Sequence, residues 1–363
     1  MKKIFILFVI IAIAALIGFQ ACHRDTDPNV YAAGYYLDTG DGFERACYWK
    51  NGKFYDLHPQ DAEFSRAESV FVYGENAYIT GNYYYNGRYR ACYWVNTNFI
   101  PLVTENETSV GHSIYVKGGI VYIAGAYGDH STACYWVDNN GVISRTVYSL
   151  PSPSDAYSIF VDEAMVFTAG TFYTYPNAFF MNDNDHYNPL IELKGPADPA
   201  TCSGALSTTL KNSIFYTAGY YYEQYGTVTE VACYWKDMLA DKGPELIILE
   251  GYHANSIAVG PNNRVYLAGF YQDNTGADRA CYWDYDTLFP LELTFPQKNS
   301  KAESVTVLGN DVYIAGHYLR GDLQDPEKDG INTAVYWKNG TPNSLIVVKP
   351  NKGTFALSIA VKD

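Results

Sequence analysis

The stretch VYIAGAY, residues 121–127, decides the fold, because variants of it return along the whole chain of 363 residues. It combines β-branched and aromatic residues around a glycine, a composition typical of β-strands. Seven copies occur, and their glycines are Gly34, Gly81, Gly125, Gly170, Gly219, Gly269 and Gly316. These glycines lie 44 to 50 residues apart, a period suited to a unit of four short strands.

Each repeat contains further recurring phrases. An AxS phrase, such as residues 67–72, precedes the glycine, and an ACYW phrase, such as residues 46–49, follows it. A polar turn then leads to a short apolar segment, which we expect to end near Leu57, Leu102, Leu150, Leu193, Leu249, Leu293 or Val347. Each repeat is therefore predicted to hold four strands, and no helical periodicity competes after residue 22.

The two ends of the chain complete each other. The first glycine phrase, residues 30–36, has no AxS phrase before it, whereas the last AxS phrase, residues 356–361, has no glycine phrase after it. We therefore expect the C-terminal strand to supply the first strand of the N-terminal unit. The predicted fold is all-β: a seven-bladed β-propeller of four-stranded antiparallel blades over residues 29–363, closed by the C-terminal strand pairing into the N-terminal blade.

The unit, for example residues 254–293, resembles the bacterial extracellular HAF repeat. That repeat couples an alanine-initiated strand to a VxG strand and an aromatic HAFxW strand. The HAF position of this chain reads ACY or an altered form of it, which departs from the family pattern. The resemblance implies an exported propeller and little about chemistry.

The N-terminal residues are typical of an export signal. Two lysines precede an apolar run from Ile4 to Phe19, and small residues lead to Cys22, as in secretory signal peptides. The run is shorter than the roughly 20 residues that span a bilayer.

Residues 1–22 also resemble a bacterial lipoprotein signal peptide, although Phe19 and Gln20 depart from its pattern. The resemblance implies that Cys22 is acylated, for example with palmitate, and that residues 23–28 form a tether to the membrane. The implied location is the outer membrane, facing the periplasm or the cell surface. Asp25 and Asp27 resemble the surface-export signal of Bacteroidota lipoproteins.

Without residues 1–22 the chain keeps 23 basic and 39 acidic side chains, a formal charge of −16. Nucleic acid is therefore excluded as a partner, since binding phosphate needs a basic surface. We expect no cofactor and no metal.

The cysteines and tryptophans of the ACYW phrase are interpreted as packing residues. Stacked sheets lie about 10 Å apart, too far for a disulfide, so we expect buried thiols at Cys47, Cys92, Cys134, Cys233 and Cys281. Cys202 lies outside the repeat and has no evident partner. The serines of AxS are expected to make hydrogen bonds between blades and not to act as nucleophiles.

The loops after the second and fourth strands vary widely in length, and all of them emerge on one face, where function is expected. The aromatic residue two places after each glycine repeats, so we assign it to packing. The non-repeating loop residues are the candidate ligand-binding residues: Tyr84, Tyr85, Arg88, Tyr89, Tyr175, Tyr222 and Tyr225. Tyrosine suits contacts with sugars, peptides and proteins.

We therefore expect an envelope-anchored, non-enzymatic binding or scaffold module for a glycan, a peptide or another outer-membrane protein. The alternative is a carbohydrate-active hydrolase or lyase, in which Glu68 and Glu303 are paired carboxylates and His112 is the base. The blades of the two glutamates are not adjacent, so they must reach far to share one bond. The alternative requires that the three residues converge in one axial pocket with perturbed pKa values.

Overall fold

The structure is a computed structural model. It describes residues 27–103, 107–129, 131–163, 165–173, 177–183, 190–195, 203–222, 230–236, 243–293, 297–321, 330–349 and 351–363. These residues are all-β apart from one 3₁₀ turn at Pro261–Asn263. Within the described ranges, no helix is long and apolar enough to cross a membrane.

Five sheets each contain four antiparallel strands that are consecutive in the chain. The first contains β4 (Phe64–Tyr73), β5 (Asn76–Tyr85), β6 (Arg88–Val95) and β7 (Asn98–Pro101). The second contains β8 (Ser109–Lys117), β9 (Ile120–Tyr127), β10 (Thr132–Asn139) and β11 (Val142–Val147). The third contains β12 (Ser154–Asp162), β13 (Met165–Phe172), β14 (Asn177–Asn182) and β15 (Leu190–Leu193).

The fourth and fifth sheets repeat this order. The fourth contains β16 (Ser203–Lys211), β17 (Ile214–Tyr222), β18 (Glu230–Lys236) and β19 (Glu245–Ile248). The fifth contains β20 (His253–Val259), β21 (Val265–Gln272), β22 (Asp278–Asp284) and β23 (Thr287–Pro290). We call β4, β8, β12, β16 and β20 first strands.

A sixth sheet has eight strands and joins the two ends of the chain. One half contains β24 (Gln297–Leu308), β25 (Asp311–Arg320), β26 (Asn332–Lys338) and β27 (Thr341–Ser344). The other half contains β28 (Asn351–Lys362), β1 (Asn29–Asp38), β2 (Glu44–Lys50) and β3 (Lys53–Asp56). One parallel bridge, Asn332 to Gly353, joins the halves. Their first strands are β24 and β28.

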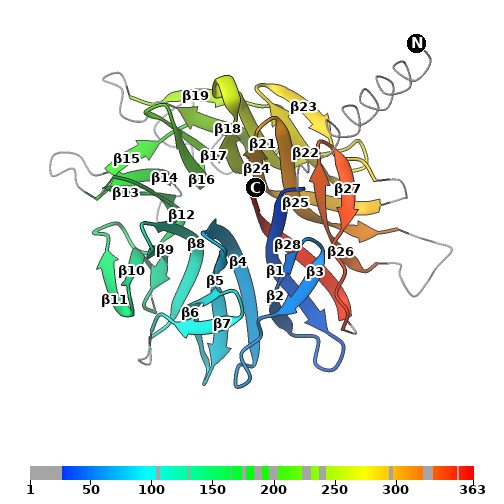
Figure 1. Cartoon of the computed structure of the whole chain (residues 1–363). Coiled ribbons are helices and arrows are strands. Elements are labelled where there is room, and N and C mark those ends of the chain that lie inside the picture. The colour runs from blue at the N-terminus through cyan, green and yellow to red at the C-terminus, as the bar shows by residue number, and fades with distance from the viewer. Residues whose placement is uncertain are drawn as a thin grey trace, which may run out of the picture.

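The sheets are arranged around a centre in a propeller-like manner, with the first strands nearest the middle (Figure 1). The C-terminal strand β28 pairs antiparallel with β1, from Asn29 opposite Lys362 to Asp38 opposite Asn351. It also contacts the first strands on both sides, β24 and β4. The two ends of the chain therefore belong to one four-stranded half of the sixth sheet.

The serines of the AxS phrase make hydrogen bonds between neighbouring first strands, as predicted. Ser358 Oγ accepts a bond from the Val70 N–H at 3.1 Å, and Ser304 Oγ accepts one from Ile359 at 3.3 Å. Four more such bonds are accepted by Ser113, Ser158, Ser207 and Ser256. Each bond stabilises the fold by about 1 kcal/mol.

A second set of hydroxyls, which sequence reasoning missed, lies four residues before the AxS serine. Ser65 Oγ accepts a bond from the N–H of Ala46, the alanine of the preceding ACYW phrase, at 2.9 Å. The same bond, at 2.8 to 3.1 Å, is accepted by Ser109, Ser154, Ser203, Ser300 and Thr354. The first strand is thus tied to the third strand of the preceding unit.

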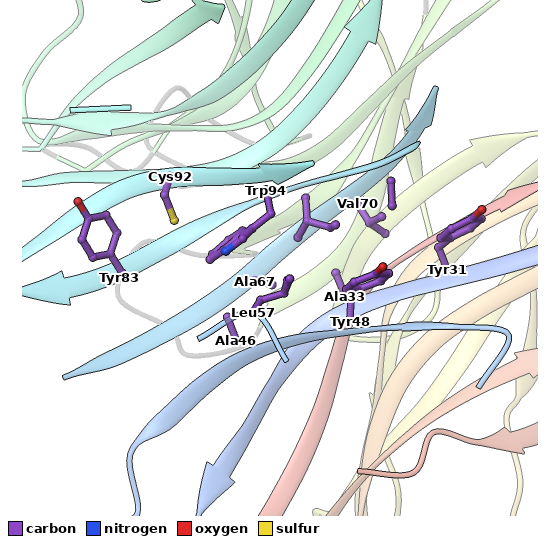
Figure 2. Close-up of a cluster of buried hydrophobic side chains, with 12 residues drawn as sticks. Tyr31, Ala33, Ala46, Tyr48, Leu57, Ala67, Val70, Tyr83, Cys92 and Trp94 are labelled. Atoms are coloured by element: carbon purple, nitrogen blue, oxygen red, sulfur yellow. The ribbon is translucent and has the colours of Figure 1, made fainter. Parts of the chain in front are cut away.

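The core lies between the sheets, and Figure 2 shows the cluster where β1 and β2 pack against β4, β5 and β6. The five repeat cysteines are free thiols and fully buried, as predicted, and burial raises their pKa values. The six tryptophans are also buried. The Trp283 indole N–H donates at 2.8 Å to the carbonyl of Glu250, which follows the last strand of the preceding sheet, as expected of a packing residue between sheets.

The predicted end of the outer segment is wrong by two residues in three repeats. Leu57 donates its N–H to the Ala46 carbonyl, but in the later repeats this bond comes from Tyr148, Leu291 and Leu345, not from Leu150, Leu293 and Val347. The outer strands β23 and β27 have only four residues. Because alternation puts residues two apart on the same face, the sequence offered two equivalent apolar candidates.

Candidate functional site

Every first strand carries one extra residue opposite the glycine phrase. Ala67 pairs with Gly81 and Ser69 pairs with the adjacent Thr80, so Glu68 has no partner in the ladder. The same bulge recurs in all first strands, at Glu68, His112, Tyr157, Leu206, Asn255, Glu303 and Leu357. Because a β-bulge redirects a side chain, these variable residues are set apart from the ladder at the long-loop end of their strands.

The glycine of the repeat makes the bulge possible. A Cβ on Gly81 would lie 2.0 Å from the Arg66 carbonyl oxygen, inside any van der Waals contact. The corresponding distance is 1.8 to 2.1 Å at all seven repeat glycines. The residue that marks the fold in the sequence therefore also shapes the long-loop face.

Two further variable positions meet beside the bulges. One is the residue that precedes the alanine of AxS, and the other is the residue that follows the glycine. Within each unit these two residues face each other across the strands, as Phe355 faces Tyr35. The Arg66 guanidinium lies 4.4 Å from the ring centre of Tyr35, which stacks on Phe355 at 4.5 Å. The His317 ring meets Phe355 edge-on at 4.9 Å.

The same two positions continue this stack beyond His317. Lys301 pairs with His317 across the strands, and its ammonium lies 4.1 Å from the ring centre of Phe270. His253 stacks between Phe270, at 5.2 Å, and Tyr220, at 4.3 Å. We call these eight residues the stacked row: Arg66, Tyr35, Phe355, His317, Lys301, Phe270, His253 and Tyr220. The remaining residues at these two positions have smaller side chains: Asn82, Val110, Ala126, Asp155, Thr171 and Gly204.

A pocket of about 460 Å³ opens where the stacked row ends at Arg66. We call it the Arg66 pocket. Asn82 and Val110, which line it, leave space where larger side chains stand in the stacked row. Its aromatic wall includes Phe64 and Tyr89, whose rings meet edge-on at 5.2 Å. The exposed fraction of Tyr89 is 45%, so an apolar ring face is available to a ligand.

The floor of the pocket holds one positive charge among carboxyl groups. Arg66 Nη2 donates to the Tyr35 hydroxyl at 3.2 Å, and its Nε lies 3.5 Å from Glu68 Oε1. This Nε is buried and has no hydrogen-bond partner among the described residues. Burial raises the pKa of Glu44, which also lines the pocket, while Arg66 opposes that shift. With both glutamates ionised, the pocket carries one excess negative charge.

The structure separates the loop tyrosines by environment. Tyr89 lines the Arg66 pocket, and Tyr84 lies behind its wall, stacked on Phe64 at 4.6 Å. Tyr85 lies under the Arg90 guanidinium at 5.3 Å.

The remaining loop candidates have partners within the chain or lie outside the described residues. Arg88 forms an ion pair with Asp129 at 2.8 Å. Tyr222 donates its hydroxyl to Glu230 at 2.7 Å. Tyr175 and Tyr225, like Cys22 and Cys202, lie outside the described residues.

The three residues of the enzymatic alternative lie in two different environments. Glu303 accepts a hydrogen bond from Asn255 at 3.2 Å and lies 3.6 Å from His317. Burial raises the pKa of Glu303, and Glu68 raises it further. His112 instead lies 4.0 Å from Asp155. No contact between His112 and either glutamate occurs in the described structure.

The described residues also contain no group of three His, Cys, Asp or Glu side chains placed to hold a metal ion. The stacked row contains two histidines, but burial lowers the pKa of His317 to about 4. His253 bonds to Glu230. The described residues of this face offer aromatic rings together with fixed donors and acceptors.

Several solved structures resemble the fold. A putative 6-phosphogluconolactonase from Bacteroides fragilis matches with a TM-score of 0.50 at 10% identity, over 94% of this chain and 99% of its own. The BP39L lectin from Burkholderia pseudomallei matches at 0.53 and 10%, over 87% and 94%. A puromycin-hydrolysing peptidase from Mycobacterium tuberculosis matches at 0.53 and 12% over 90% of this chain, which spans 53% of that protein.

At these identities the likeness concerns the fold alone. No protein-family model matches the chain, and no curated protein matches its sequence at a significant level.

Proposed function

We propose that the chain is a seven-bladed propeller, closed by its C-terminal strand, that serves as a scaffold for binding. The proposal is supported by seven repeats, by the pairing of β28 with β1 and by the hydroxyl bonds from β28 to both neighbouring first strands. Full closure leaves no unpaired terminal blade. Such a ring holds the variable residues of one face in fixed positions.

We propose further that this face binds a carbohydrate without chemical conversion. The observation that carries the proposal is the Arg66 pocket, where an exposed Tyr89 ring stands beside charged and amide groups. An aromatic face stacks on the C–H face of a sugar, while Arg66, Glu68 and Asn82 supply donors and acceptors for hydroxyl groups. A lectin is among the proteins of similar fold, which is consistent with this use.

The charge of the pocket limits the class of sugar. Glu44 and Glu68 outnumber Arg66, and Glu303 adds to the negative field at that guanidinium. Bringing an acidic sugar into this pocket would place like charges together at a free-energy cost. We therefore expect neutral sugars or amino sugars to bind, and uronic acids to bind poorly.

The Tyr89→Ala variant tests the binding proposal. We expect it to weaken binding of neutral oligosaccharides at the Arg66 pocket by about tenfold, the loss of roughly 1.4 kcal/mol of stacking. Calorimetric titration measures the change. The matched control is Tyr73→Ala, because Tyr73 is similarly exposed at 41% but ends β4 on the opposite face. Equal losses in both variants, or none in either, would contradict the proposed site.

We also propose that Cys22 is acylated and anchors the protein in the outer membrane. The supporting features are the lysines, the apolar run and the small residues that precede this cysteine. More than one acyl chain at that position is needed for stable anchoring.

The Cys22→Ser variant is therefore expected to lose all incorporation of labelled palmitate. It should also shift from the membrane fraction to the soluble fraction, or remain uncleaved. Cys202→Ser is the control and should keep the label. Labelling of Cys22→Ser at the wild-type level would refute the anchor.

A further inference from the structure

The turns between third and fourth strands carry a recurring asparagine. Asn51, Asn96 and Asn339 adopt positive φ values of 51°, 56° and 50°, a region that asparagine tolerates. The Val30 N–H donates to Asn51 Oδ1 at 2.8 Å, and Asn51 Nδ2 donates to Asn29 Oδ1 at 2.9 Å. Equivalent pairs of bonds occur at Asn96 and Asn339. These side-chain hydrogen bonds stabilise the turns.

In the hairpin of β22 and β23, other residues stand in place of the turn asparagine and of the residue that accepts its side-chain hydrogen bond. Tyr285 occupies the asparagine position with φ 60°, and its N–H still donates to the Val265 carbonyl at 2.9 Å. Arg264 occupies the position of Asn29, and its Nε donates to Asp284 Oδ1 at 2.6 Å within a two-pronged ion pair. Two residues that depart from the repeat therefore lie beside each other.

Tyr285 is in a conformation that is costly for its residue type. A bulky side chain at positive φ strains the backbone, and the Tyr285 side chain is 50% exposed, so burial offers little compensation. Strain of this kind is found at ligand-binding positions, where the gain is functional.

Tyr285 and Arg264 line a pocket of about 510 Å³. A second exposed ring, Phe289, lines it as well and stacks on Tyr282 at 5.2 Å. The turns that form this pocket lie at the end of the sheets opposite the long loops. The Tyr285 pocket and the Arg66 pocket therefore open on opposite faces.

We infer that the Tyr285 pocket is a second binding site, for a neutral sugar. The ion pair of Arg264 and Asp284 presents donors and acceptors side by side, which matches two adjacent hydroxyl groups that both donate and accept. The faces of Tyr285 and Phe289 offer stacking surfaces. Since Asp284 balances Arg264, Asp286 in the pocket wall leaves an excess negative charge, which disfavours acidic sugars. The inference stands independently of the Arg66 pocket.

The Tyr285→Asn variant separates a binding role from a structural one. It restores the asparagine of the other turns, so we expect the midpoint of thermal unfolding to rise by about 1–2 °C. Binding of neutral sugars at this site should fall at least about tenfold. The reciprocal control, Asn339→Tyr, should lower the midpoint and leave sugar binding unchanged.

Binding is measured by saturation-transfer NMR in the Tyr89→Ala background, in which we expect binding at the Arg66 pocket to be about tenfold weaker. The probes are methyl glycosides and short oligosaccharides of glucose, galactose, mannose and N-acetylglucosamine, with glucuronic acid as the acidic comparison. A neutral probe that binds and is lost in Tyr285→Asn supports the site. No binding of any neutral probe, unchanged binding in Tyr285→Asn, a preference for glucuronic acid or a lowered midpoint would each overturn it.

Discussion

Deletion of residues 354–363 is expected to lower the midpoint of thermal unfolding by more than about 10 °C and to abolish a single cooperative transition. The deletion removes most of the strand that pairs with β1. It also removes Ile359 and Ala356 from the core and breaks the hydroxyl bonds to β4 and β24. Burial of the isoleucine alone contributes about 1.5–3 kcal/mol, and each hydrogen bond about 1 kcal/mol. Together these contributions amount to about 3.5–5 kcal/mol, near the lower end of the free energy of unfolding of a typical domain.

Two controls make this deletion specific to the joining of the chain ends. Removal of Asp363 alone, which follows the end of β28 and is exposed, should leave the midpoint unchanged. A synthetic peptide of residues 351–363, added to the shortened chain, should restore part of the lost stability. An unchanged midpoint in the 354–363 deletion would show that β28 does not hold the ring together.

The strands could be predicted from sequence because the same phrase recurs in different surroundings. What repeats must serve the repeated structure, so the cysteines opposite the glycines and the tryptophans of ACYW were assigned to packing, where the structure places them. The register of the outer strands does not follow from the repeat in the same way. Leu291 and Leu293 are both apolar and two residues apart, and in the structure Leu291 makes the hydrogen bond to the Ala280 carbonyl and is the more deeply buried of the two.

The site could be predicted only in part, because its geometry depends on the bulge. One extra residue in a first strand leaves the apolar pattern on either side intact, so the sequence names Glu68 as a candidate of the enzymatic alternative but does not predict the bulge there. The position that follows each repeat glycine was not singled out from the sequence, because it lies within a repeated phrase. Its members Tyr35, Asn82 and His317 differ strongly between copies, and that variation was the available signal. The Arg66 pocket also depends on the small size of Val110, which lines it together with Arg66. Sequence alone did not show that these two residues lie near each other.

The Gly81→Ala variant is expected to lose about 3 kcal/mol or more of the free energy of unfolding. Its added Cβ would meet the Arg66 carbonyl at 2.0 Å and the Ala67 Cα at 2.9 Å. Both are backbone atoms held by the β4–β5 ladder, so no side chain can move aside. Gly353→Ala is the matched control, because its Cβ would have its nearest neighbour at 3.5 Å. Urea denaturation of the two variants compares them, and equal stabilities would contradict the close approach at Gly81.

Deleting Glu68 in the Gly81→Ala background should restore much of that stability. Without the bulge, Ala67 and Ser69 become consecutive and still face opposite sides, as their partners Gly81 and Thr80 do. The Arg66 carbonyl is then no longer forced against residue 81. A double variant no more stable than Gly81→Ala would show that the glycine serves something other than the bulge. The rescued protein should bind neutral sugars at the Arg66 pocket more weakly, since it lacks Glu68. The variant that lacks Glu68 would then be stable but bind sugar weakly. This result would mean that the bulge serves binding, by placing a polar side chain at the long-loop face, and not stability.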